Sequence, residues 1–96
     1  MNKKICERLI RKENRQDGSY TYSYELLMSE GDMVANFRLP LYSVRVKMTD
    51  INGEEREASA KDVFSRKSEA TAFFEKIVRN LATPIDLAYI LEDEMA

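Results

Sequence analysis

The sequence contains no histidine and no tryptophan, and Cys6 is its single cysteine among 96 residues. Without histidine the chain cannot build His-based metal sites or the Ser-His and Cys-His pairs of nucleophilic catalysis. One cysteine cannot form an internal disulfide, and the sequence has no Gly-rich phosphate-binding loop. These absences remove most familiar catalytic chemistry. We therefore expect no enzyme, no cofactor and no metal.

Glycine and proline are scarce, with three and two residues, while 44% of the chain is apolar and 33% is charged. Such a composition is typical of a folded globular protein and not of a disordered or low-complexity chain. A length of 96 residues fits one domain covering residues 1–96. The 15 basic and 17 acidic residues give a net charge of -2, which argues against broad binding of polyanions.

Long apolar runs are also missing. The first eight residues have no apolar segment of the kind that secretory signals require. No run approaches the 18 or so residues of a membrane span. The sequence therefore predicts a cytoplasmic protein without a membrane partner.

The first half of the sequence alternates between apolar and polar residues with the period of β-strands. One strand is predicted around residues 20–28 and a second around residues 42–48, with Pro40 near its start or at a bulge. A polar strand over about Glu54 to Ala60 is expected to return as a solvent-facing edge. The residues predicted to share the apolar face of the first two strands are Tyr20, Tyr22, Tyr24, Leu26, Met28, Tyr42, Val44, Val46 and Met48.

Turn signals separate these strands. Asp17-Gly18 precedes the tyrosine strand, and Glu30-Gly31-Asp32 follows it. Asn52-Gly53 suits a tight hairpin with positive φ at both central positions. Residues 3–13 are predicted to form a further strand, although Cys6, Leu9 and Ile10 also fit the spacing of a helix.

The period changes to that of helices after Ser65, which we expect to cap an amphipathic helix. Thr83, Pro84 and Asp86 supply an N-cap, a first-turn proline and an acid for a second helix that runs to about Asp93. A link of only one or two residues is expected to join the two helices at a sharp corner. The apolar residues predicted to face the sheet from the first helix are Ala70, Phe73, Phe74, Ile77, Val78 and Leu81.

These patterns resemble an uncharacterised family of small proteins from clostridial-type Gram-positive bacteria, a domain of unknown function. The resemblance covers most of the chain and implies no catalytic or binding residue. It depends on the tyrosine-rich strand after Asp17-Gly18, on Leu91-Glu92-Asp93, and on the joint Arg79-Asn80-Leu81-Ala82-Thr83-Pro84-Ile85.

The tyrosines at positions 20, 22, 24 and 42 allow two interpretations. They could form an aromatic platform for single-stranded bases, or they could face the helices and fill the core. The residues that alternate with them include no cation in the tyrosine strand. We favour the core, because a domain without tryptophan needs these rings to fill its interior.

Charge is unevenly distributed along the chain. Residues 1–16 carry six basic and two acidic groups, a net +4, whereas residues 70–96 carry two basic and five acidic groups, a net -3. The two segments either neutralise each other or present opposite charges to partners. A basic edge would be the first candidate if the domain bound nucleic acid. Its members are Lys3, Lys4, Arg8, Arg11 and Lys12.

Together the patterns predict an α+β fold in which an antiparallel sheet of about four strands is followed by two C-terminal helices packed on one face. The leading hypothesis for function is a small non-enzymatic interaction or regulatory module that binds another protein or itself, and the alternative is a nucleic-acid-binding module. The last helix has more apolar residues than one docking face can cover, so either Leu87 or Tyr89 is expected on an interaction surface, with a homodimer as one outcome. A cavity of about 300 Å³ or more is not expected in so small a domain.

Overall fold

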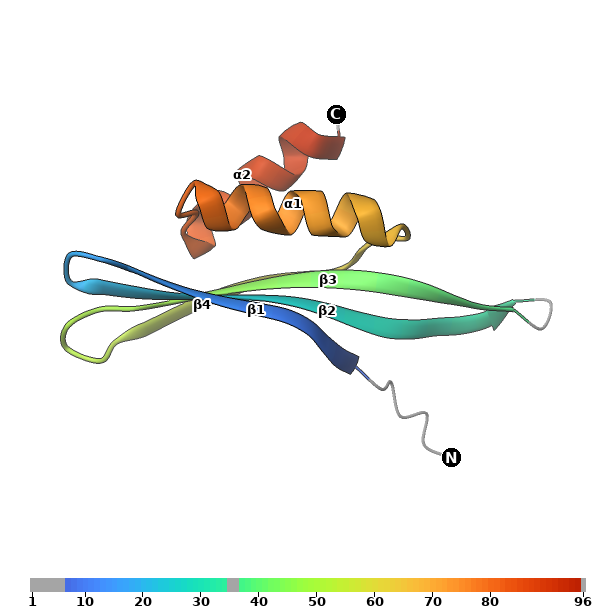
Figure 1. The fold of residues 1–96 in the computed structure, drawn as a ribbon, viewed down its shortest axis with the longest axis horizontal. Helices are drawn as coiled ribbons and strands as arrows, with labels where there is room; N and C mark the ends of the chain where they lie inside the picture. The colour runs from blue at the N-terminus through green and yellow to red at the C-terminus, as the bar shows by residue number, and fades with distance from the viewer. Residues whose placement is uncertain (1–6, 35–36, 96) are drawn as a thin grey trace.

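The computed structural model describes residues 7–34 and 37–95. Side chains are described at all of these positions except 31–34, 37–39 and 95. Four strands are followed by two helices (Figure 1): β1 (Glu7–Asp17), β2 (Tyr20–Val34), β3 (Phe37–Thr49), β4 (Glu55–Phe64), α1 (Lys67–Arg79) and α2 (Pro84–Met95). This confirms the predicted α+β architecture. Residues 7–13 form a strand and not a helix, whereas Lys3, Lys4 and Cys6 lie outside the described residues.

The sheet is an antiparallel meander in the order β1-β2-β3-β4. The register pairs Tyr24 of β2 with Val46 of β3 and with Glu13 of β1. Because side chains alternate across a strand, the apolar set of β2 and β3 points to one face and their polar set to the other. β1 and β4 form the two edges, and β4 matches the predicted polar edge strand but continues to Phe64.

Two hairpin turns lie at one end of the sheet (Figure 1). Gly18 has a φ of 61° and starts a two-residue loop between Asp17 and Tyr20. In the other turn only Gly53 has positive φ, at 84°, and the Asp50 carboxylate accepts hydrogen bonds from the backbone N–H groups of Asn52 and Glu54. The expected two-residue Asn-Gly turn is therefore wrong. The loop has three residues, because the Asp50 side chain stabilises a wider turn in which only its last residue needs positive φ.

The turn expected at residues 30–32 is also wrong. β2 continues through this segment to Val34, and the register shifts between Glu30 and Met33 instead. A glycine within a strand is compatible with such an irregularity. Pro40 pairs with Glu30 where β3 has not yet met β4, so its missing N–H removes no bond to a third strand.

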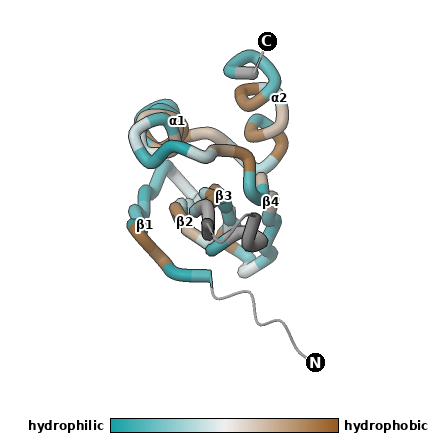
Figure 2. Tube along the Cα trace, turned by 90° about the vertical axis from the view of Figure 1, so that its right-hand side faces the viewer, coloured by the Kyte–Doolittle hydropathy of each residue, from teal (hydrophilic) through white to brown (hydrophobic). Residues whose placement is uncertain are grey.

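Both helices cover the same face of the sheet (Figure 2). α1 lies over β2 and β3, and α2 lies over β4 and β3. The core between the layers contains Tyr22, Tyr24 and Tyr42, which confirms the core interpretation of these rings; Tyr20 is exposed. The Tyr24 hydroxyl donates a hydrogen bond of 2.8 Å to the Ala82 carbonyl, so its polar atom is satisfied inside the core.

The N-terminus of α1 differs from the prediction. Ser65 lies outside the helix, and the N-cap position is Arg66, which makes no side-chain capping hydrogen bond. The predicted Ser65 cap is therefore wrong. The helix forms because Ala70, Phe73, Phe74 and Ile77 are buried on one face, and tertiary packing of such a face outweighs the missing cap.

The corner between the helices spans residues 80–83, which is longer than the one or two residues expected. Ala82 N–H donates to Ile77 O and Leu81 N–H donates to Val78 O, while Leu81 has a φ of 53°. These are the two bonds of a Schellman ending, with leucine where glycine is usual. The structure confirms the predicted Thr83 cap: Asp86 N–H donates to Thr83 Oγ1, and Thr83 N–H donates to an Asp86 carboxylate oxygen.

The contrast between the two helix starts gives a prediction. Thr83→Ala should lower the free energy of unfolding by about 1 kcal/mol, because it removes the hydroxyl that caps α2. Ser65→Ala is the matched control and should change stability by less than about 0.5 kcal/mol, because Ser65 caps nothing. Urea unfolding of both variants tests this. Equal losses for both would contradict the assignment of the caps.

Candidate functional site

The two surface candidates on α2 lie on opposite sides of the helix. Leu87 is 2% exposed and belongs to the core, whereas Tyr89 is 67% exposed. Ile85, one turn earlier, is 65% exposed, and residues four apart in a helix are neighbours on its surface. Leu87 is therefore excluded as a surface residue, and the exposed apolar stripe of α2 consists of Ile85 and Tyr89.

The described members of the candidate basic edge do not share one face. Arg11 lies 2.8 Å from Glu75 of α1 and 5.4 Å from the centre of the Phe74 ring, on the side of the helices. Hydrogen bonds from Arg11 to Glu75 and Glu13 raise the pKa of its guanidinium. Lys12 lies opposite Glu25 in the register between β1 and β2, and its side chain is on the other face of the sheet. Arg8 is exposed, and Lys3 and Lys4 lie outside the described residues.

Part of the charge difference between the two ends of the chain is neutralised within the fold. Besides the contact between Arg11 and Glu75, Arg15 of β1 donates a hydrogen bond of 2.9 Å to Val78 O near the end of α1. The cation therefore lies beside the negative end of the helix dipole. The acidic residues of α2 have no such contact with β1. α2 is therefore strongly acidic, whereas β1 carries four basic and three acidic residues.

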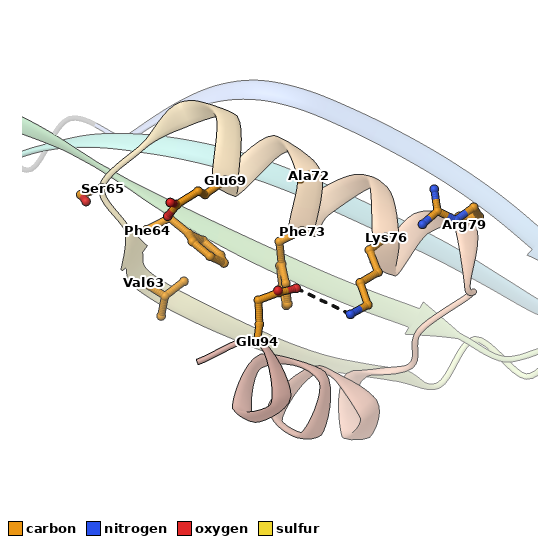
Figure 3. Close-up of a pocket in the computed structure, with 9 residues that line it drawn as sticks. All are labelled: Val63, Phe64, Ser65, Glu69, Ala72, Phe73, Lys76, Arg79 and Glu94. Atoms are coloured by element: carbon orange, nitrogen blue, oxygen red, sulfur yellow. Dashed lines mark ion pairs between the residues drawn. The ribbon is translucent and has the colours of Figure 1, made fainter. Parts of the chain in front are cut away.

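A groove of about 530 Å³ opens between α1 and α2 (Figure 3). Its floor and inner wall are formed by Phe64 and Val63 at the end of β4 and by Phe73 of α1, while charged side chains form its rim. The aromatic rings of Phe64 and Phe73 lie 5.2 Å apart. This interhelical groove is lined by Val63, Phe64, Ser65, Glu69, Ala72, Phe73, Lys76, Arg79 and Glu94.

One ion pair crosses the interhelical groove. Lys76 Nζ of α1 lies 3.6 Å from Glu94 Oε1 of α2, and Figure 3 shows the Glu94 carboxylate in front of the Phe73 ring. Phe73 is 1% exposed and belongs to the core, where its ring packs against Phe64. Because both charged side chains are largely solvated, the pair contributes only about 0.2–1 kcal/mol. A ligand that offers an apolar group to Phe73 can therefore displace this cover at small cost.

The charges around the groove are not balanced once the ion pairs are taken into account. Lys76 is paired with Glu94, and Glu69 has Arg66 at 4.0 Å. Within the part of the chain that the structure describes, no ion pair involves Arg79, the rim residue at the end of α1. The uncapped N–H groups of the first turn of α1 add partial positive charge. The unpaired charge at the rim is therefore positive.

A bulge in β4 places the groove wall. The register between β3 and β4 shifts between Tyr42 and Val44, and Asp62 has a φ of 55°. Asp62 N–H donates to Ser43 Oγ at 2.8 Å, and Ser29 Oγ donates to an Asp62 carboxylate oxygen at 3.0 Å. These bonds hold the strained residue. The bulge turns Val63 and Phe64 toward the helices.

A second hollow, of about 300 Å³, lies on the open face of the sheet, where Arg45 and Glu25 are 2.6 Å apart. The hydrogen bond to Glu25 raises the pKa of Arg45. Lys47 lies 3.8 Å from Glu55. Cross-strand ion pairs of this kind stabilise a solvated sheet face. Among the described residues, Lys12 is the charged lining residue of this hollow that has no ion pair.

Metal and membrane features were searched over residues 7–34 and 37–95. No cluster of three or more acidic or cysteine side chains that could hold a metal ion occurs there. No helix in these segments is long and apolar enough to cross a bilayer. The same segments contain no buried side-chain nitrogen or oxygen without a hydrogen-bond partner.

The sequence did not predict the interhelical groove, and the expectation that this domain has no cavity of about 300 Å³ or more is wrong. The groove exists because α2 diverges from α1 after a four-residue corner, and residue spacing does not give the angle between two helices. The signal in the sequence was a pair of opposite charges, Lys76 and Glu94, on the two adjacent predicted helices. These two side chains form an ion pair across the groove once the corner is formed.

Comparisons with known proteins identify a family but no activity. Residues 3–96 match the model of a family of unknown function, DUF6514. No curated protein and no solved structure matches the chain. The site must therefore be interpreted from its own geometry.

Proposed function

The chain belongs to DUF6514, a family of unknown function, and from this premise we propose that it is a small non-enzymatic module that binds another protein chain through the interhelical groove. The observation that carries the proposal is the groove of about 530 Å³ with Phe64 and Phe73 beneath a single solvated ion pair. Concave sites with an apolar floor and a few polar groups are the usual binding sites of small ligands, and apolar grooves also receive amphipathic helices of partner chains.

The size of the groove favours a protein segment that inserts one or two large side chains. Phe64, Phe73 and Val63 offer apolar contact, while Ala72 leaves space at the α1 wall. Aromatic anchors that fill such pockets contribute most of the binding energy at protein interfaces. An amphipathic helix laid into an apolar groove is a recurrent mode of this recognition.

The charge of the rim favours an acidic partner. Arg79 of the rim has no ion pair among the described residues, and displacement of Glu94 would free Lys76 as well. Complementary charge increases the association rate and selects the orientation of the partner. We therefore propose an acidic amphipathic segment with a large apolar anchor as the occupant. A cytoplasmic location and an origin of the family in clostridial-type Gram-positive bacteria stay predictions.

A peptide titration tests this function. The probe is a short acidic amphipathic peptide with tyrosine and isoleucine four residues apart, followed by the methyl signals of the labelled protein in NMR. We expect Val63 and Ala72 to shift, while Leu9 on the open sheet face does not. A peptide with alanine in place of both anchors should bind at least about tenfold more weakly. Shifts confined to other methyl groups, or none, would refute the proposal.

The ion pair provides a second readout. Glu94→Ala should tighten peptide binding by about two- to fivefold, because it uncovers Phe73 and frees Lys76 at a cost of less than about 1 kcal/mol. Glu92→Ala is the matched control, since Glu92 is exposed on the same helix and does not line the groove. Unchanged binding in Glu94→Ala would show that the peptide lies elsewhere.

A further inference from the structure

α2 of this chain has the two features proposed for the occupant of the interhelical groove, namely acidic charge and large exposed apolar side chains. It carries four acidic residues and no basic residue within Pro84–Met95. Among the described residues, Ile85 and Tyr89 are the large apolar side chains that a helix exposes to solvent. On the helix surface Glu92 lies in line with this stripe, and Asp86 and Asp93 lie together on one side of it. We propose that the occupant of the groove is α2 of a second copy, with Tyr89 and Ile85 inserted over Phe73.

This inference rests on the proposed function and identifies the partner. Figure 1 shows α2 rising from the sheet toward its C-terminal end. Its exposed stripe of Ile85 and Tyr89, which we call the ridge, lies on the helix that also contributes Glu94 to the groove. One protomer thus carries both the ridge and a residue of the groove wall on the same helix. When two such surfaces meet about a two-fold axis, each ridge enters the groove of the other copy. The contact occurs twice and closes as a dimer.

Both charge and the irregular edge strands favour association through the interhelical groove over association through an edge of the sheet. The acidic outer side of α2 would meet Arg79 at the groove, which has no ion pair among the described residues. By contrast, both edge strands of the sheet are interrupted, by the register shift at Ile10 in β1 and by the Asp62 bulge in β4. Bulges at edges hinder the addition of another strand.

Sedimentation over a concentration series from about 1 μM to about 1 mM tests the dimer. We expect the wild type to associate within this range. Tyr89→Glu removes the anchor and Ala72→Glu fills the groove with a negative charge, so each variant should weaken association at least about tenfold. Both positions are exposed, so the melting temperature should be unchanged. Ile51→Glu, at an exposed hairpin tip, is the control and should associate like the wild type.

Mixing the two variants gives the decisive readout. Tyr89→Glu keeps its groove and Ala72→Glu keeps its anchor, so a mixed dimer has one intact contact while neither variant alone has any. We expect the Val63 methyl signals of labelled Tyr89→Glu to shift when unlabelled Ala72→Glu is added, and not when unlabelled Tyr89→Glu is added. Equal behaviour of the two mixtures would overturn the inference.

Tyr89→Glu also separates the dimer inference from the proposed function. Tyr89→Glu leaves its groove free, so the acidic peptide should bind to it whatever the oligomeric state of the wild type. Peptide binding together with a wild type that is monomeric at about 1 mM would overturn the dimer and leave the function standing. Failure of both the peptide and the dimer would overturn both.

Discussion

Phe74→Ala should lower the free energy of unfolding by about 3–5 kcal/mol, a large part of the 5–15 kcal/mol that is typical of a domain. Phe74 is fully buried between α1 and the sheet, with the Arg11 guanidinium 5.4 Å from its ring centre. The substitution leaves a cavity and removes the ring that Arg11 covers. Urea unfolding measures the loss.

Phe73→Ala should lower the free energy of unfolding by a similar amount. Both rings of α1 are buried in the core, although they pack on different sides of the helix. Phe73 packs against Phe64 toward α2, and Phe74 packs toward β1. Lys67→Ala on the exposed side of α1 is the control and should change stability by less than about 0.5 kcal/mol. Losses below about 1 kcal/mol in both phenylalanine variants would show that α1 does not dock as described.

The second large effect concerns pH. Burial, followed by the neighbouring Tyr22, raises the pKa of Tyr24 from 10 to about 12. The folded protein therefore holds the phenolic proton more tightly than the unfolded chain does. The stability that this proton provides is complete below pH 10 and is lost as the pH rises through about 12. We expect a loss of about 2–3 kcal/mol across this window.

Tyr24→Phe separates this effect from general alkaline unfolding. At neutral pH the variant should be about 1–3 kcal/mol less stable, because the Ala82 carbonyl in the corner between the helices loses its donor. Its stability should then fall less steeply than that of the wild type between pH 10 and pH 12. Tyr20→Phe changes an exposed ring in the same strand and should keep the wild-type profile. Parallel profiles of Tyr24→Phe and the wild type would contradict the assignment.

Local patterns were sufficient for the architecture. The period-two alternation of β2 and β3, the helical spacing in α1, and Thr83 with Asp86 at the start of α2 each depend on residues close in sequence. Side-chain direction follows directly from backbone geometry in such elements. The buried tyrosines followed from the same argument together with the absence of tryptophan.

Turn geometry was harder to predict, because competing side chains decide it. The Asp50 carboxylate widens the turn at Gly53, and a strand continues through Gly31 where a turn signal was present. The missing Ser65 cap shows the same limitation: burial of α1 outweighs the preference of one hydroxyl for a helix start.

The sequence by itself determined three of the strands, the two helices, the tyrosine core and the absence of histidine chemistry, because each depends on composition or on short-range periodicity. Residues 3–13 fitted the spacing of both a strand and a helix, and pairing with β2 decided between them. Only the tertiary structure decided that Leu87 is buried while Tyr89 is exposed, and that α1 and α2 enclose a groove. Both features depend on the angle at which a four-residue corner directs α2 across β4. That angle results from packing between residues distant in sequence, which no local pattern encodes.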